Sequence, residues 1–186
     1  MIYQTERLIV RPWRDDDLEA AFAIYSNPEV MRYLGAQPGV PIPDREKMAE
    51  RMRFWKERDR DLRPGLGFWA IEAQGRPVGS VILRPLPNDV KIEVGWHLGQ
   101  EHWGNGYATE AAQGAIKHGF ETVGLDEIYC IIYPENTRSI RVAERLGLEP
   151  LGTTKQYHDQ ELLFYRVVKP LFRADLQLEG RDRRTA

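Results

Sequence analysis

The chain has 186 residues, of which 42% are hydrophobic and 29% are charged. Because 28 acidic residues outnumber 26 basic ones, the formal net charge is -2, which argues against the strongly basic surface of a nucleic-acid-binding protein. The single cysteine, Cys130, excludes an intrachain disulfide framework and a multi-cysteine metal site. The sequence has no apolar run of about 20 residues and no signal-peptide pattern, so we expect a cytoplasmic protein without a membrane partner.

The first 61 residues predict one strand, two helices and a loop. Acidic residues at 15–17, followed by apolar residues at helical spacing, predict a helix over 18–25. Three prolines within 37–43 remove backbone donors and fix φ, so this segment is predicted to be a loop. The other elements expected here are a strand over 7–10 and a surface amphipathic helix over 44–61.

After residue 66 the sequence becomes richer in strand-like segments. Three such segments separated by turn-forming residues predict an antiparallel meander, over 68–71, 77–83 and 90–98. Apolar residues at i, i+3, i+4 and i+7 predict a helix over 107–123. A strand over 126–133 follows, and a right-handed crossover would place it parallel to the strand over 90–98. The remaining expected elements are a helix over 137–146 that ends at Gly147, strands around 151–157 and 162–168, and a disordered tail over 179–186.

A loop with two glycines lies between the third meander strand and the predicted helix over 107–123. Gly104 and Gly106 allow the main chain to turn so that successive N–H groups point to one spot, and the helix N-terminus adds partial positive charge. Such a spot suits a phosphate or pyrophosphate group. A tight turn that merely starts a helix is an equally good interpretation of the loop alone. The loop lacks the lysine of a P-loop and the third glycine of a dinucleotide fold.

Four segments of the chain match one known pattern in the right order. They are Thr5-Glu-Arg-Leu8, Glu93-Val-Gly-Trp-His-Leu98, Trp103-Gly-Asn-Gly-Tyr-Ala-Thr-Glu-Ala111 and Asn136-Thr-Arg-Ser-Ile-Arg-Val-Ala-Glu-Arg-Leu-Gly147. Together they resemble the GNAT superfamily of acetyl-CoA-dependent N-acetyltransferases, most closely the branch that acetylates serine or alanine at ribosomal-protein N-termini. The resemblance implies an α+β fold: a mixed, mostly antiparallel sheet with two splayed parallel strands and flanking helices. Residues 1–178 would then be a single acyl-CoA N-acyltransferase domain.

The same resemblance implies acetyl-CoA as cosubstrate and a set of residues that bind it. The implied contacts are Trp96, His97, Leu98, Trp103, Gly104, Asn105, Gly106, Tyr107, Ala108, Asn136 and Arg141. A solvated helix face is the competing interpretation of Arg141. The family pattern places Arg or Gln where this chain has Glu101, and an acid is unexpected beside a pyrophosphate. We therefore expect the Glu101 side chain to turn outward, so that backbone amides of 102–108 serve instead.

Transfer of an acetyl group to an amine needs a group that takes up the amine proton. An amine attacks a thioester only when neutral, whereas an α-amino group has a pKa of about 8 and a lysine of about 10.4. Glu93 alternates with Gly95 and His97 on one face of its strand, where the family often places its base, so Glu93 is the candidate base. A surface or ion-paired glutamate is the alternative. His97 could instead relay a proton or pack beside the cofactor.

The departing thiolate of CoA benefits from a proton donor. Many GNAT enzymes use a tyrosine at the position of Ala143, and Ser139 is the residue that resembles the ribosomal-protein branch at this site. Its hydroxyl could protonate or hydrogen-bond the sulfur, or it could only satisfy backbone groups at a helix start. A backbone N–H within 96–98 is the expected donor to the oxyanion. We expect Cys130 to be a core residue rather than a nucleophile.

The sequence thus predicts an enzyme that moves an acetyl group from acetyl-CoA to a primary amine by direct attack through a tetrahedral intermediate. The acceptor is either a peptide N-terminus or a small molecule such as an antibiotic, a polyamine or an amino acid. A non-catalytic acyl-CoA-binding sensor is the alternative from another class. The histidines show no paired ligand spacing, so no metal is expected, and either a monomer or a homodimer fits. The first two helices, the loop over 37–43 and the late strands are expected to form the substrate wall.

Overall fold

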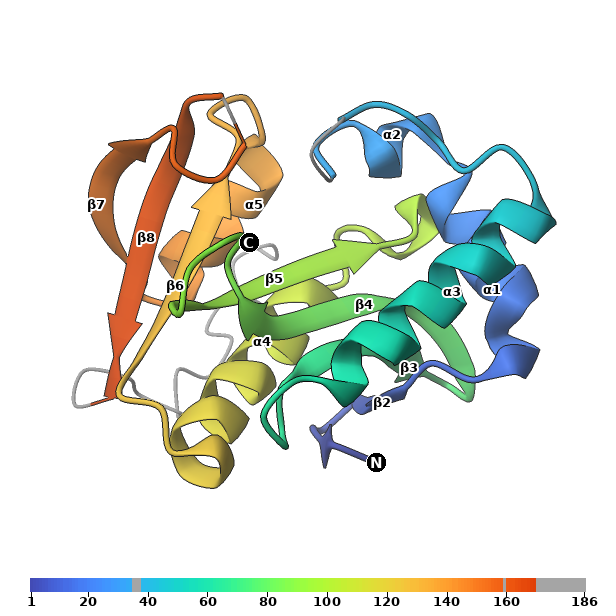
Figure 1. The fold of residues 1–186 in the computed structure, drawn as a ribbon, viewed down its shortest axis with the longest axis horizontal. Helices are drawn as coiled ribbons and strands as arrows, with labels where there is room; N and C mark the ends of the chain where they lie inside the picture. The colour runs from blue at the N-terminus through green and yellow to red at the C-terminus, as the bar shows by residue number, and fades with distance from the viewer. Residues whose placement is uncertain (35–37, 159, 170–186) are drawn as a thin grey trace, which may run out of the picture.

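The computed structural model describes residues 1–34, 38–158 and 160–169. These residues form an eight-stranded sheet in the order β1-β2-β3-β4-β5-β6-β8-β7, with helices on both of its faces (Figure 1). Neighbouring strands are antiparallel except for β5 and β6. The strands are β1 Tyr3–Gln4, β2 Leu8–Pro12, β3 Gly67–Ala73, β4 Arg76–Pro85, β5 Ile92–Leu98, β6 Glu127–Ile132, β7 Glu149–Thr154 and β8 Leu162–Val168.

Capping side chains mark where several helices begin. The Asp44 carboxylate accepts a hydrogen bond from the backbone N–H of Lys47 at 2.8 Å, and the Asn27 amide oxygen accepts one from Glu29 at 2.9 Å. Gly147, with φ of +69°, follows the last helix, as the sequence predicts. The α-helices are α1 Leu18–Tyr25, α2 Pro28–Met31, α3 Arg45–Arg60, α4 Tyr107–His118 and α5 Thr137–Arg145.

Alternating side chains of the central strands supply two hydrophobic cores. On β4, Val81 and Leu83 pack into the core that α4 and α5 cover. Ile82, between them in sequence, points to the opposite face and joins the core beneath α1 and α3. This sheet between two helical layers confirms the predicted α+β class, and the face beneath α1 and α3 is the one that carries the candidate site.

The parallel pair β5 and β6 meets at a single register position, Glu93 opposite Tyr129. This pairing confirms the predicted parallel arrangement of the two strands, which α4 connects. Beyond this position the two strands diverge, so residues 94–98 of β5 have no ladder partner on β6. Figure 1 shows β6 turning away from β5 toward β8 and β7.

Some sequence predictions needed correction. The strand expected over 151–157 is β7, which ends at Thr154 because the chain then turns and returns as β8, and buried Tyr157 lies in that turn. The helix expected over 107–123 remains α-helical only to His118, after which Gly119–Val123 forms a π-helical turn. The sequence analysis missed β1 and α2, which are too short to show a periodicity. The predicted tail over 179–186 lies outside the described residues. Among the helices that the structure describes, none is long and apolar enough to cross a bilayer.

Candidate active site

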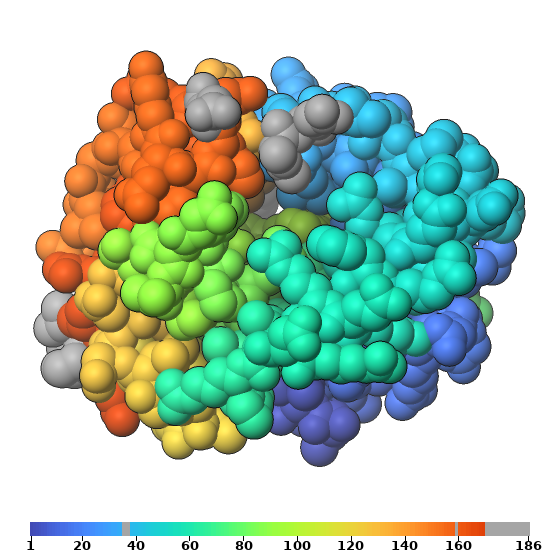
Figure 2. Space-filling view, viewed as in Figure 1, coloured from blue at the N-terminus to red at the C-terminus, as the bar shows by residue number. Residues whose placement is uncertain are grey.

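A cavity of about 860 Å³ opens between α3 and the diverging strands β5 and β6. Figure 2 shows the surface hollowed between α3 and the C-terminal strands. Its walls come from α1, α2, α3, the segment Val40 to Pro43, β4, β5, β6 and the start of α5. Leu162 of β8 and His158 close one side. The early helices, the described part of the proline loop and the late strands, which the sequence predicts to form the substrate wall, therefore all contribute to the lining of this cavity.

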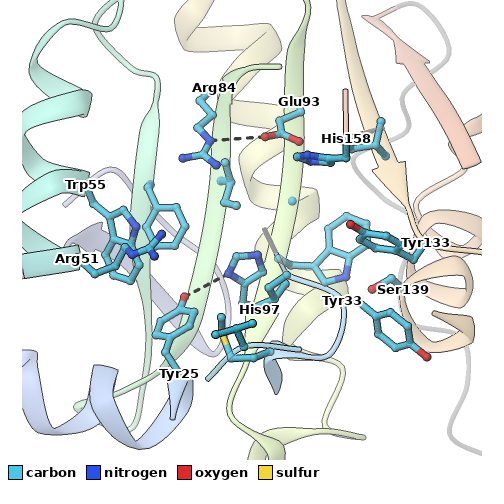
Figure 3. Close-up of a pocket in the computed structure, with 18 of the residues that line it drawn as sticks. Tyr25, Tyr33, Arg51, Trp55, Arg84, Glu93, His97, Tyr133, Ser139 and His158 are labelled. Carbon is cyan, nitrogen blue, oxygen red and sulfur yellow. Dashed lines mark hydrogen bonds and ion pairs between the residues drawn. The ribbon is translucent and has the colours of Figure 1, made fainter. Parts of the chain in front are cut away.

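Glu93 lies on β5 with its side chain directed into this cavity, and only 13% of that side chain is exposed (Figure 3). Its Oε1 atom is 3.5 Å from Nε of Arg84, which faces it across the β4–β5 ladder. Burial raises the pKa of the Glu93 carboxyl above its ordinary value, and the opposing charge of Arg84 only partly offsets this. The carboxylate thus holds a proton more readily than an exposed glutamate.

His97 lies four residues further along the same face of β5 and is held by a buried hydrogen-bond chain. Its Nδ1 atom is 3.2 Å from the Tyr25 hydroxyl, which lies 2.6 Å from the Ser80 hydroxyl (Figure 3 draws the Tyr25 contact). The indole N–H of Trp13 donates to Ser80 at 3.2 Å. Burial, together with the charge of Arg84, lowers the pKa of His97 to about 3, so the imidazole is neutral at physiological pH.

The first turn of α5 brings Asn136 and Ser139 to the cavity wall opposite α3. The side-chain oxygen of Asn136 accepts a hydrogen bond from the backbone N–H of Ser139 at 3.2 Å and so caps the helix. The backbone of Ser139 is thereby satisfied, while its hydroxyl has no partner among the described residues. This leaves the hydroxyl free to act on a ligand, in contrast to the purely structural interpretation of this serine.

The glycine loop lies at the N-terminus of α4. Gly104 and Gly106 have φ of +79° and +78°, and the backbone N–H groups of 104–108 find no acceptor within the described chain. Unpaired N–H groups at the positive end of a helix are suited to a pyrophosphate, so the residues present fit acetyl-CoA there. Glu101 is 66% exposed and lies 3.6 Å from His102, which agrees with the expected outward orientation.

Neighbouring side chains fix this loop in place. The Arg7 guanidinium donates to the carbonyl of Asn105 at 2.9 Å and pairs with Glu110 of α4. The Trp103 indole donates to the carbonyl of Leu98 at 3.0 Å. The guanidinium of Arg138, from α5, lies 4.1 Å from the Trp103 ring centre, so α5 and the loop are in direct contact.

Comparison with known proteins identifies the family. Residues 7–149 match the acetyltransferase (GNAT) domain. The chain belongs to the GNAT family. This assignment makes it an acyltransferase, and enzymes of this family use acetyl-CoA.

Several GNAT relatives align over most of the chain. An uncharacterized N-acetyltransferase of Bacillus subtilis, YoaA, is 30% identical over 91% of this chain and 97% of its own. The spermidine N(1)-acetyltransferase of Escherichia coli is 26% identical over 77% and 73% of the two chains. The ribosomal alpha-N-protein acetyltransferase RimL, solved in complex with coenzyme A, superposes with a TM-score of 0.72 over 90% and 97% of the two chains. Its sequence identity is 16%, so that likeness concerns the GNAT fold.

The structure divides the GNAT site residues predicted from sequence into two groups. Glu93, Trp96, His97, Asn136 and Ser139 line the cavity. The others lie outside its lining: Leu98, Trp103, Gly104, Asn105, Gly106, Tyr107, Ala108 and Arg141. The buried Leu98 side chain packs in the core beneath α4, and Arg141 is exposed without a partner in the described structure. The cofactor contacts of both groups stay predictions.

The sequence analysis missed several residues of the site. Arg84 escaped notice because only the β4–β5 register places it opposite Glu93. Tyr25 and Ser80 were missed for the same kind of reason, since a helix and another strand bring them to His97. Cys130 is buried, as expected, and burial raises the pKa of its thiol, which disfavours the nucleophilic thiolate. Among the described residues, no three His, Cys, Asp or Glu side chains form a cluster that could hold a metal ion.

Proposed function

We propose that this acyltransferase moves an acetyl group from acetyl-CoA to a primary amine bound in the cavity beside α3. The observation that carries the proposal is the convergence of Glu93, Asn136 and Ser139 on one cavity at the point where β5 and β6 diverge. A carboxylate with a raised pKa and a hydroxyl without a partner in the described structure thus line the same cavity (Figure 3). These are the two groups that proton transfer from an amine and to a thiolate requires.

Glu93 is the proton acceptor in this proposal. Its raised pKa brings the carboxylate closer to the pKa of an α-amino group, about 8, which makes proton transfer between them more favourable. The nearby Arg84 guanidinium orients the carboxylate, and its charge favours the ionised form and so opposes part of the effect of burial. The lost proton therefore passes from the amine to a group that is buried beside it rather than to bulk water.

The cofactor would lie along the loop and the start of α5. Acetyl-CoA, when bound, supplies the acetyl thioester. The free N–H groups of 104–108 would hold its pyrophosphate, with Trp103, Arg141 and the β5 segment 96–98 alongside. The amide NH₂ of Asn136 would donate to the pantetheine arm, because its oxygen already caps α5. The Ser139 hydroxyl would donate a proton or a hydrogen bond to the thiolate sulfur.

Two classes of acceptor are consistent with this site. The RimL relative is named for a ribosomal alpha-N-protein activity, and the Escherichia coli relative is named for spermidine. The Tyr33 hydroxyl, from the cavity lining, donates to the carbonyl of Glu135 at 3.3 Å and so forms a bridge between the α2 side and the segment before α5. A peptide N-terminus or a small amine would enter beside this bridge, and the reaction is the same for both.

Thiol release from acetyl-CoA tests the proposal. Peptides with different N-terminal residues and a panel of small amines are assayed with the wild type, Glu93→Gln, Ser139→Ala and the exposed control Glu121→Gln. We expect turnover on one class of amine, reduced in the first two variants and retained in the control. Absence of thiol release with every amine, although CoA raises the melting temperature, would contradict the enzyme and favour the acyl-CoA-binding sensor.

A further inference from the structure

The charged side chains that line the cavity leave one cation without a partner. Lys47 pairs with Glu50 at 2.8 Å, and Arg84 pairs with Glu93 at 3.5 Å. Arg51 also lines the cavity and has no ion pair or hydrogen bond in the described part of the chain. The wall therefore carries a net positive charge. A polyamine would be repelled by this charge, whereas an anionic group on the acceptor would be attracted by it.

The hydrogen-bond chain at His97 determines which imidazole nitrogen carries the proton. Ser80 is fully buried, and its oxygen accepts the Trp13 N–H, so the Ser80 hydroxyl proton can go only to its other partner, Tyr25. The Tyr25 proton must then go to Nδ1 of His97. A neutral imidazole that accepts at Nδ1 carries its own proton at Nε2.

His97 therefore presents a fixed N–H donor rather than a base. Its Nε2 atom has no partner among the described residues, and the ring lines the cavity. Its pKa of about 3 agrees with this neutral form. A neutral donor complements an acceptor oxygen at every pH at which the protein is folded and active.

A row of neighbouring aromatic rings leads from α3, which carries Arg51, to His97. Trp55, one turn after Arg51 on α3, stacks on Phe68 with ring centres 4.2 Å apart, and Phe68 lies 5.8 Å from the His97 ring. Figure 3 shows Arg51 on the α3 side of the cavity, Ser139 on the opposite side and His97 between them. An amine that reaches toward Ser139 thus leaves the rest of its molecule beside these two donors.

We propose that the acceptor amine carries a carboxylate group, which the Arg51 guanidinium and the Nε2–H of His97 bind. This inference rests on the proposed function, since it names the class of amine that the site takes. A free amino carboxylate and a peptide with an acidic side chain near its N-terminus present the same chemistry. A guanidinium and a neutral N–H together satisfy the two oxygens of one carboxylate.

Matched pairs of acceptors test this inference in initial-rate assays. One arm compares a set of amino acids with their carboxamides, and the other compares peptides that have Asp or Glu at the second position with peptides that have Asn or Gln there. The arm in which the acid is preferred identifies the source of the carboxylate. In Arg51→Gln we expect the preference in kcat/KM for the acid over its amide to fall about tenfold, mainly through KM. Arg53→Gln, on the same helix outside the cavity lining, should keep the preference.

His97 is tested by two variants that differ in their donor. His97→Gln keeps an N–H donor and should retain more of the preference for the acid than His97→Phe. Turnover with equal rates for acids and amides in the wild type would overturn the carboxylate inference while leaving acetyl transfer intact. An equal loss on both members of each pair in Arg51→Gln would also overturn it. No turnover with any acceptor would contradict the proposed function and this inference together.

Discussion

At the residue scale, Glu93 and His97 show how one environment gives two side chains different roles. They lie four residues apart on the same face of β5, and both side chains line the cavity. Burial disfavours the charged form of each, so it raises the pKa of the acid and lowers the pKa of the base. Glu93 becomes a better proton acceptor, and His97 becomes a permanent neutral donor.

This difference predicts the pH dependence of the reaction. The rate should fall as pH drops through the pKa of Glu93, because the protonated acid cannot accept the amine proton. Since that pKa is raised, the acidic limb of kcat/KM should lie above the ordinary carboxyl value of 4.5. Glu93→Gln should remove the limb and lower kcat by a factor of about 10² to 10⁴. If the acidic limb of the kcat/KM profile persists in this variant, a group other than Glu93 accepts the amine proton.

Ser139→Ala tests the other end of the proton path. Because the Asn136 cap uses only the backbone N–H of Ser139, removal of the hydroxyl should leave α5 and its stability intact. We expect kcat to fall by about tenfold or more with little change in KM for acetyl-CoA. The matched control is Thr137→Ala in the same helix turn, where the exposed side chain is outside the cavity lining. Equal rates in the two variants would argue against a role for the Ser139 hydroxyl.

At the scale of elements, the loop before α4 depends on glycine at a left-handed position. Gly106 has φ of +78°, and a Cβ there would lie 3.3 Å from the Arg7 guanidinium. Gly106→Ala should therefore cost about 1 kcal/mol of stability and raise KM for acetyl-CoA.

Gly75→Ala is the control for this prediction. Gly75 has φ of +75° in the turn between β3 and β4, outside the loop before α4, and its Cβ would meet no atom within 4 Å. Thermal unfolding should show similar losses for the two variants, but only Gly106→Ala should alter KM. A rise in KM in both would assign the effect to general destabilisation.

Elements with a clear period could be predicted from sequence, and those set by long-range pairing could not. The α4 segment follows the helical period up to His118, and Asp44 marks the start of α3. The end of β7 depends instead on its pairing with β8, which no local pattern encodes. The candidate site divides in the same way: the motif residues were found, whereas Arg84 and Tyr25 become partners only once strands and helices assemble.

At the scale of the whole molecule, a buried ionic network joins the N-terminal segment to the sheet. The Arg11 guanidinium, 6% exposed, donates to both carboxylate oxygens of Asp17 at 2.6 and 2.9 Å. It also pairs with Glu72 of β3 at 2.6 Å. Burial alone would raise the pKa of Asp17, but hydrogen bonds from Arg11 and the Arg14 backbone lower it overall. The folded state therefore favours ionised Asp17.

Removal of this charge should destabilise the fold. Asp17→Asn leaves Arg11 buried with less compensation, so the free energy of unfolding in urea should fall by about 3–5 kcal/mol. The stabilisation by Asp17 is present above its ordinary pKa of 3.8 and is lost as pH falls through the lowered folded value. The free energy of unfolding of Asp17→Asn should therefore lack this contribution that is lost in acid. Asp16→Asn, an exposed neighbour, should change stability by no more than about 0.5 kcal/mol.

The single register position between β5 and β6 has a further consequence for local opening. Strands β6, β8 and β7 form one part of the sheet, and strands β1 to β5 form the other. A single ladder position and shared packing on α4 connect the two parts. We expect native-state hydrogen exchange to reveal these three strands as one cooperative unit that opens at a lower free energy than β3 and β4. A ligand that spans the gap would slow exchange across both halves together, even at amides that it never touches.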